Sequence, residues 1–440
     1  MTAAISPAAS FDPVDEATYR RRQRAWALYD WANSAFATTI IAGFFPIFFK
    51  QYLSAGVDTA VSTARLGLAN SISAIVIALS APFLGAIADR GTSRKRFLMF
   101  FAIMGITATS AMSLASQGSW VIAVWLYLFA SIGFSGGNVF YDSLLPHVAR
   151  PEEIDQVSAR GYAMGYLGGG LLLAVNLAWY LMPERFGFAD GSQAVRASFL
   201  SVAVWWALFS IPLFRRVPEP PATATGPREN PVRAGFSRLR ETFHRMQHYK
   251  ELWKFLVAFW LYADGIGTII KMATIYGAEI GIGTADLAGA LLLTQFVGIP
   301  LTLVFGRLAR RTGAKRAIYL ALGVYTLISI LGFFMTQPWH FWVLAGMVGL
   351  VQGGSQSLSR SLFGAMTPKA RSAEFYGFFD ISSKFAGIAG PLLFGLTASL
   401  TGSGRWSIVS LIVFFVAGAL LLSRVNEQEG MAIARAENLM

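Results

Sequence analysis

The sequence predicts an all-α integral membrane protein with twelve membrane-spanning helices, arranged as two pseudo-repeated six-helix bundles. Three observations support this fold class. Of 440 residues, 55% are hydrophobic and only 14% are charged, whereas a soluble protein of this size carries about 25% charged residues. Long uncharged runs recur along the chain, and roughly 18 apolar residues without charge are enough to cross a bilayer as a helix. Finally, the two halves of the chain are similar to each other in sequence.

The clearest uncharged runs cover residues 97–115 and 120–141. Runs of this kind predict spans at 26–52, 66–88, 97–116, 120–145, 158–182, 197–214, 252–278, 286–306, 316–336, 339–366, 373–399 and 405–424. They divide the chain into a tail (1–24), an N-terminal bundle (25–214), a linker (215–250), a C-terminal bundle (251–425) and a second tail (426–440).

The predicted linker is the one long polar break in the sequence. It contains PEPPATATGPRENP, which is rich in proline and small residues and is typical of a flexible connection. The basic stretch RLRETFHRMQHYK follows, for which we expect an amphipathic helix on the membrane surface. The break lies near mid-chain, with six predicted spans on either side.

Two pairs of segments repeat across this break. GGNVFYDSLLPHVARP, from Gly136, parallels GGSQSLSRSLFGAMTP, from Gly353. GAIADRGTSRKR, from Gly85, parallels GRLARRTGAKR, from Gly306. Repetition at half the chain length is typical of membrane proteins in which two related bundles enclose a shared site.

The net charge of +12 indicates topology rather than nucleic-acid binding. About 28 of the 36 Lys and Arg residues fall on one side of the predicted spans, and basic loops stay in the cytoplasm. We therefore expect a multi-pass protein of the inner (plasma) membrane, surrounded by lipid, with both termini cytoplasmic. The sequence has no cysteine and no G-x-x-x-x-G-K-[ST] motif, which argues against thiolate metal sites and ATP as the driving force. No cofactor or metal is predicted.

GAIADR followed by RKR, between the second and third predicted spans, resembles the signature of the major facilitator superfamily. Gly91 stands one place early for that signature, and Arg310 replaces its acid in the second copy. LYDWANSAF, FYDSLLP, GYLGGG, QGGSQSLSRSL and FYGFFDISSKFAGIAGP are similar to the branch that includes the autophagy-linked vacuolar amino-acid effluxer and its bacterial relatives. This resemblance implies the superfamily fold, transport by alternating access, and amino acids as substrates.

Polar side chains concentrate in the first, fourth, seventh, tenth and eleventh predicted spans, and the first four of these line the cavity in the fold that the chain resembles. Residues three or four apart share a helix face. Charged residues within a membrane cost roughly 2.5–3.5 kcal/mol near the helix centre and usually face a cavity or a partner. The candidate substrate-path residues are Asp30, Asn33, Asn138, Tyr141, Asp264, Lys271, Gln352, Gln356, Arg360, Asp380 and Lys384.

An amino-acid-like substrate needs a donor for its carboxylate and an acceptor for its ammonium group. Arg360 can bind a carboxylate with two parallel hydrogen bonds, and Asp30 or Asp264 can meet the ammonium. A desolvated carboxylate suits a proton carrier, and we expect Asp142 first and Asp30 second in this role. The coupling ion would then be H⁺.

A structural explanation exists for several candidates. Asn33, Asn138 and Gln352 could simply form hydrogen bonds between helices, and Asp380 with Lys384 could be an ion pair that only stabilises the fold. In the fifth span, Gly161, Gly165 and Gly169 permit either close helix packing or a sliding contact. These alternatives stay open at the level of sequence.

Gly85, Asp89 and Arg90 form the candidate cytoplasmic gate. Asp89 falls at the C-terminal end of its helix, where the helix dipole disfavours an acid. We therefore expect a nearby arginine, or the N-terminus of a facing helix such as the eleventh, to stabilise it. A contact of this kind would close the cytoplasmic side in one conformation. Alternatively, the motif only sets topology and a tight turn.

The sequence thus favours a secondary carrier for a small polar solute over an enzyme. Two other functions remain open. A membrane-embedded protein that handles lipids, such as a flippase, would need a polar opening toward the lipid. A transporter-like receptor or scaffold would no longer need the gate motif, which is present here.

Overall fold

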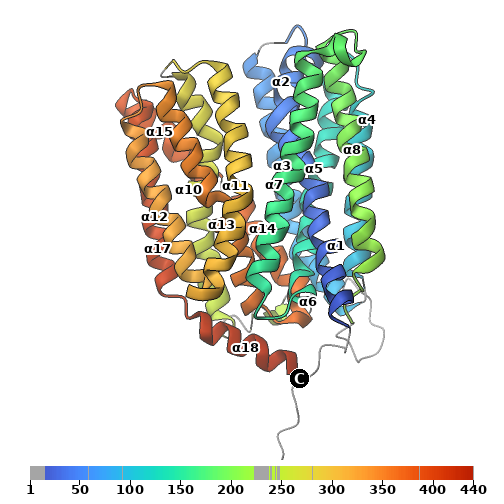
Figure 1. Cartoon of the computed structure of the whole chain (residues 1–440), viewed down its shortest axis with the longest axis vertical. Helices are drawn as coiled ribbons and strands as arrows, with labels where there is room; N and C mark the ends of the chain where they lie inside the picture. Colours follow the sequence, from blue (N-terminus) through green and yellow to red (C-terminus); the bar gives the residue numbers. More distant parts are fainter. Residues whose placement is uncertain are drawn as a thin grey trace, which may run out of the picture.

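The structure is a computed structural model that describes residues 15–57, 59–91, 93–221, 237, 240–242, 244, 248–279, 281–385 and 387–439. The described residues are helices and their connections, with no strand among them. Figure 1 shows two groups of upright helices side by side, with the first half of the chain in one group and the second half in the other. The protein is therefore an all-α integral membrane protein of two bundles, as predicted.

The first bundle begins with a helix that changes its winding along its length. Its segments are α1 (Glu16–Ala35), the π-helical η1 (Phe36–Phe44), α2 (Phe45–Phe48) and the π-helical η2 (Phe49–Leu53). The remaining elements are α3 (Thr59–Arg90), α4 (Arg94–Met112), α5 (Trp120–Ser143), α6 (Leu145–Val148), α7 (Ile154–Leu181), η3 (Pro183–Phe186) and α8 (Gly191–Arg216).

The second bundle repeats the plan, with two of its spans in segments. Its elements are α10 (Lys250–Glu279), α11 (Thr284–Thr312), α12 (Ala314–Phe333), α13 (Pro338–Met366), η4 (Lys369–Arg371), α14 (Ser372–Phe385), α15 (Ala389–Thr401), α16 (Gly404–Ser410), α17 (Ile412–Ser423) and α18 (Glu427–Leu439). In the described part of the chain, nine helical segments are long and apolar enough to cross a membrane. The other three predicted spans correspond to α4, which starts with three basic residues, to the polar α13, and to α14 with α15.

Three clusters of buried apolar side chains hold the bundles together, one in the second half and two in the first. The largest cluster of buried apolar side chains lies within residues 249–425. The other two clusters lie within residues 25–217, apart from Ala373, which joins one of them from the second half. Because each half buries its own apolar side chains, each can keep its internal packing when the contacts between the halves change.

The chain termini differ from the sequence-based expectation. α1 begins at Glu16, inside the predicted tail, and Asp15 caps it by accepting a hydrogen bond from the Thr18 amide at 2.6 Å. The tail after residue 425 forms α18. The predicted linker and its surface helix fall largely outside the described residues.

The start of α1, together with α6 and α18, lies at one end of the molecule (Figure 1). Basic residues gather there, among them Arg20, Arg94, Arg150, Lys369 and Arg435. We call this end the basic end.

The two halves contact each other through glycines near the basic end. A Cβ at Gly85 of α3 would overlap the backbone of Ala373 of α14, and one at Gly377 would lie 2.6 Å from the nitrogen of Pro82. On the other side of the molecule, a Cβ at Gly306 of α11 would lie 2.7 Å from that of Ala159 of α7. Small residues let helix backbones approach closely in a membrane, and here they join the halves rather than helices of one bundle.

We predict that Gly85→Ala weakens the contact between the halves, because the added methyl group overlaps the backbone of Ala373. Gly323→Ala is the matched control, since a Cβ there meets no atom within 4 Å and alanine favours a helix by about 1 kcal/mol. The chain lacks cysteine, so Ala159→Cys, at a buried position of the same interface, can report opening through its rate of thiol labelling. Labelling should rise with Gly85→Ala and not with Gly323→Ala; equal rates would contradict this packing.

Candidate functional site

A cluster of one cation and two anions joins the halves in the interior. Nη1 of Arg360, on α13, lies 2.9 Å from Oδ1 of Asp142 on α5 and 3.2 Å from Oδ2 of Asp30 on α1. The Arg360 side chain is 2% exposed, against 13% for Asp30 and 19% for Asp142. Charges this deeply buried are stable only when they are paired. The pairs therefore link the arginine of one half to acids of the other.

Hydrogen bonds fix the orientation of the guanidinium group. Its Nε donates to Oγ of Ser158 and its Nη2 to the Ser158 carbonyl, both at 2.9 Å. Ser158 lies on α7 of the first half, so these bonds also cross the interface. The hydroxyl of Tyr376 donates to the carbonyl of Arg360 at 3.0 Å. With Nε and Nη2 committed to Ser158, Nη1 is left to face the two carboxylates.

Aromatic rings enclose the cluster. Trp26 and Tyr141 stack at 4.6 Å, and the indole nitrogen of Trp26 donates to the Tyr141 carbonyl at 3.1 Å. The guanidinium carbon of Arg360 lies 4.9 Å from the Trp26 ring and 4.3 Å from that of Tyr162, within the range of cation–π attraction. The Tyr141 hydroxyl donates to Asp30 at 2.8 Å. The site thus offers both charged groups and flat aromatic faces.

Glycines of α7 let α1 carry Asp30 into this position. A Cβ at Gly161 would lie 2.5 Å from Oδ2 of Asp30, and one at Gly165 would lie 2.6 Å from Oγ of Ser34. One turn further on, Gly169 stands against Thr38 in the same way. The glycines repeat every four residues and so lie along one face of α7, which packs against α1. Of the two roles that the sequence allows for these glycines, the structure shows close helix packing.

Four other candidate residues lie near the cluster. The amide of Asn33 donates to that of Asn138 at 2.6 Å, between α1 and α5. The Tyr166 hydroxyl donates to Oε1 of Gln356 at 3.2 Å, from α7 to α13 and thus across the halves. Gln352 stands one turn from Gln356 on the same helix. These polar groups extend the site along the interface.

Asp264 has a different environment from the one we expected. Its carboxylate accepts hydrogen bonds from the amides of Gly387, Ala389 and Gly390, at 2.8, 3.1 and 2.9 Å. These amides lie at the break between α14 and α15, which divides the predicted span 373–399. Three backbone donors stabilise this buried carboxylate, and the positive charge of Lys271 on the same helix adds to their effect. Asp264 therefore supports the helix break and lies outside the Arg360 cluster.

Of the remaining candidates, Lys271 lies beside the same break. A Cβ at Gly387, whose φ is +125°, would lie 2.7 Å from Nζ of Lys271, and only glycine adopts such a backbone readily. Asp380 lies on α14. The side chain of Lys384 is outside the described residues, so the expected pair with Asp380 stays a prediction.

At the basic end, Asp89 meets the N-terminus of the eleventh span, as the sequence predicts. Its carboxylate accepts from the amides of Ala373 and Glu374 at 3.0 and 2.8 Å, and from Nε of Arg94 at 2.6 Å. Arg94 in turn donates to the carbonyl of Lys369 at 3.0 Å. The ion pair observed with Asp89 thus comes from Arg94, whereas we had grouped Arg90 with the gate. Gly85 takes part through its contact with α14.

Sequence reasoning missed Ser158, Trp26 and Tyr162. None of them carries a charge, and aromatic residues in membrane helices also occur at lipid interfaces. A signal is present in hindsight: Ser158, Tyr162 and Tyr166 repeat every four residues and form a polar and aromatic stripe on α7.

We predict that Arg360→Gln lowers the thermal unfolding temperature markedly, because it leaves two buried carboxylates without their cation, at a cost of about 3–5 kcal/mol. Asp142→Asn should cost less, since Arg360 keeps Asp30 and Ser158. The exposed Arg311→Gln should leave the unfolding temperature unchanged. The test is intrinsic tryptophan fluorescence of the purified protein during heating. An Arg360→Gln protein as stable as Arg311→Gln would contradict the assigned pairing.

Comparison with known proteins places this chain in a family. A family model described as "Vacuole effluxer Atg22 like" matches residues 55–435. The chain is 37% identical to the MFS-type transporter YxiO of Bacillus subtilis over 96% of this chain and 98% of that protein. It is 25% identical to Autophagy-related protein 22 of Yarrowia lipolytica over 81% and 74% of the two chains.

A solved structure confirms the architecture. The major facilitator superfamily proton:xylose symporter XylE superposes with a TM-score of 0.69, at 14% identity, over 96% of this chain and 98% of that one. Similarity at this level shows the fold alone. With the family match and the relative in Bacillus subtilis, it follows that the chain belongs to the Atg22-like effluxer family and is a secondary transporter with the major facilitator fold.

Proposed function

We propose that this protein transports a small polar solute that carries a carboxylate, an amino acid in the first place, by proton-coupled alternating access. The observation that supports this most directly is the position of Arg360, which is shared between Asp30 and Asp142 of the opposite half. The family description names an effluxer of the vacuole, which agrees with solute transport.

The charges of the cluster suit proton coupling. One arginine and two carboxylates sum to −1, so one bound proton makes the cluster neutral. Asp30 also accepts a hydrogen bond from Tyr141, whereas the bond found to Asp142 comes from Arg360. Protonation of Asp142 would therefore break one ion pair between the halves, and only the single hydrogen bond from Arg360 to Asp142 would be lost with it. We assign Asp142 as the proton carrier, with Asp30 second.

Arg360 is also the group that can receive a substrate carboxylate. The guanidinium group presents its donors in a planar fork that matches a carboxylate. In the observed conformation Nη1 faces the acids, so a substrate carboxylate would compete with Asp30 and Asp142 for the same donor. Substrate binding and release of the interface are then coupled.

We prefer Asp30 to Asp264 as the acceptor for the ammonium group. The two oxygens of Asp264 already accept three backbone hydrogen bonds, which leaves them little capacity for a substrate. Asp30 remains the acid for the ammonium group. Asn33, Asn138, Gln352 and Gln356 complete the polar lining.

We assign the basic end to the cytoplasmic side of the inner membrane, because basic residues stay on that side. The contacts of Asp89, Gly85 and Gly306 then close the cytoplasmic side. Arg94 completes this gate from the first half. The observed conformation is accordingly the one closed to the cytoplasm.

The enclosed position of the cluster favours a solute carrier over a lipid-handling protein. Arg360 and both acids are at most 19% exposed and stand between the halves rather than at a lipid-facing opening. The hydrogen bonds of Asp89 at the gate likewise favour a cycling transporter over a receptor or scaffold, because a protein that does not cycle has no need of a gate.

We predict that α-amino acids raise the unfolding temperature of the purified protein, whereas amines and carboxylates of the same carbon skeleton raise it less. The stabilisation grows with the ratio of ligand concentration to its dissociation constant. Ligands that stabilise the protein are then tested as substrates by flux into proteoliposomes. A screen in which no amino acid stabilises the protein would refute the proposed substrate class while leaving the transporter fold intact.

We predict that Asp142→Asn abolishes the acceleration of substrate flux by a pH gradient, because asparagine cannot exchange the proton. Binding of the substrate should change by about threefold or less, since Arg360 remains in place. Asp190→Asn, which alters only the exposed cap of α8, serves as the control. Flux that still responds to the pH gradient in Asp142→Asn would refute this assignment of the carrier.

A further inference from the structure

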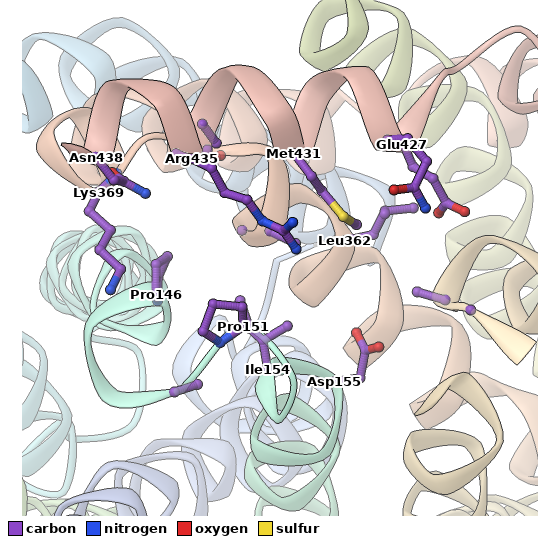
Figure 2. A pocket seen from close by; sticks show the side chains of 18 residues that line it. Pro146, Pro151, Ile154, Asp155, Leu362, Lys369, Glu427, Met431, Arg435 and Asn438 are labelled. Carbon is purple, nitrogen blue, oxygen red and sulfur yellow. The ribbon is translucent and has the colours of Figure 1, made fainter. Parts of the chain in front are cut away.

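A cavity of about 190 Å³ opens at the basic end beneath α18. Figure 2 shows it between α18 and the segment of the first half that includes Pro151, Ile154 and Asp155. Leu362 and Lys369 line it from the second half. The cavity thus belongs to both halves. None of its lining residues takes part in the Arg360 cluster, although Leu362 and Asp155 lie within one helical turn of Arg360 and Ser158.

The charged side chains around this cavity are separated by sign. Glu427, Met431 and Arg435 follow each other at intervals of four residues and form one face of α18 toward the cavity (Figure 2). Glu427 and Arg435 are eight residues apart, about 12 Å along the helix axis. In Figure 2, Asp155 stands near the Glu427 end, and Lys369 stands near the opposite end of the helix.

Arg435 and the two acids of this cavity do not neutralise one another. In the described part of the chain, no ion pair joins Arg435 to Asp155 or to Glu427. Asp155 instead accepts a hydrogen bond from the hydroxyl of Ser361 at 2.5 Å. Burial lowers the pKa of Lys369, which indicates that its ammonium group is partly desolvated. One end of the cavity is therefore acidic and the other is basic.

α18 is held firmly enough to form one wall of a site. The amide of Asn426, just before the helix, donates to Glu251 at 2.6 Å, and Lys250 pairs with Glu429 at 2.9 Å. Near the other end of α18, Oδ1 of Asn438 accepts from the amide of Lys369 at 2.8 Å. The helix dipole favours the acid at the start of α18 and the base near its end. Both ends of the wall are fixed to the second half.

We propose that this cavity binds a small dipolar molecule, with an ammonium group toward Asp155 and Glu427 and a carboxylate toward Arg435 and Lys369. A volume of 190 Å³ corresponds to about six water molecules at their liquid density. This space suits an unbranched amino acid whose two charges lie at opposite ends of the chain. An α-amino acid carries both charged groups on one carbon atom and would reach only one end of the cavity.

Binding here would act on the conformational equilibrium of the transporter. The acid Asp155 belongs to the first half, whereas Glu427, Arg435 and Lys369 belong to the second. A ligand that contacts both sets binds best while the basic end is closed, and it stabilises that conformation by mass action. The cavity is then an inhibitory site, separate from the transport path.

The experiment measures binding of β-alanine, 4-aminobutanoate and 6-aminohexanoate to the purified full-length protein by thermal shift and calorimetry. Hexanoate and hexylamine are the singly charged comparison probes. We expect saturable binding that strengthens with the distance between the two charges, and at least tenfold weaker binding of the singly charged probes. Arg435→Gln and Glu427→Gln should each weaken the binding of 6-aminohexanoate tenfold or more. Arg424 is exposed and does not line the cavity, so Arg424→Gln should leave the affinity for 6-aminohexanoate unchanged.

Several outcomes would overturn the proposal. Equal binding of hexanoate or hexylamine would show that only one end is used, and wild-type affinity in Arg435→Gln and Glu427→Gln would place the probe elsewhere. Absence of binding at millimolar concentration would exclude the site. Repeating the titration in Arg360→Gln separates this cavity from the transport site. If Arg360→Gln lost the affinity for the probe while the α18 variants kept it, the probe would bind at the central cluster.

Discussion

The arrangement of the whole molecule depends on one buried guanidinium group. A lone arginine inside a membrane protein is strongly unfavourable, and Arg360 is stabilised only because Asp30, Asp142 and Ser158 surround it. All three partners belong to the opposite half. The need to neutralise Arg360 therefore draws the two bundles together, and any conformation that separates them has to provide other partners for the same charge. In a transporter, a substrate carboxylate and a proton are the natural substitutes.

Close helix packing and polar contacts both hold this interface between the halves together. Glycines bring α3 against α14 and α7 against α1 and α11, and the polar groups then reach their partners at hydrogen-bond distance. Asp89 and Arg360 use different chemistry for the same purpose. Asp89 accepts from the backbone of a helix N-terminus, whereas Arg360 forms ion pairs. The first contact depends on how α14 is placed, and the second can respond to protons and to solute.

The sequence predicted the features that arise from local composition. Uncharged runs located the spans, and the helix dipole at Asp89 indicated the helix end that it meets. The intramembrane charges also indicated that Asp30, Asp142 and Arg360 would have partners, although their mutual pairing depends on the way in which the bundles dock. The environment of Asp264 was not predictable, because it depends on a helix break whose amides lie more than 120 residues away. The role of α18 was equally hidden, since its anchors Glu251 and Lys369 are ordinary surface-type residues in the sequence.

The hydrogen bonds of Asn438 have a consequence for biogenesis. Asn438 binds the amide of Lys369, and the carbonyl of Lys369 accepts from Arg94 of the first half. Residues 427–438 leave the ribosome after the twelve spans described above. The bond from Lys369 to α18, which supports the segment that Arg94 binds across the halves, can therefore form only after those spans have been synthesised.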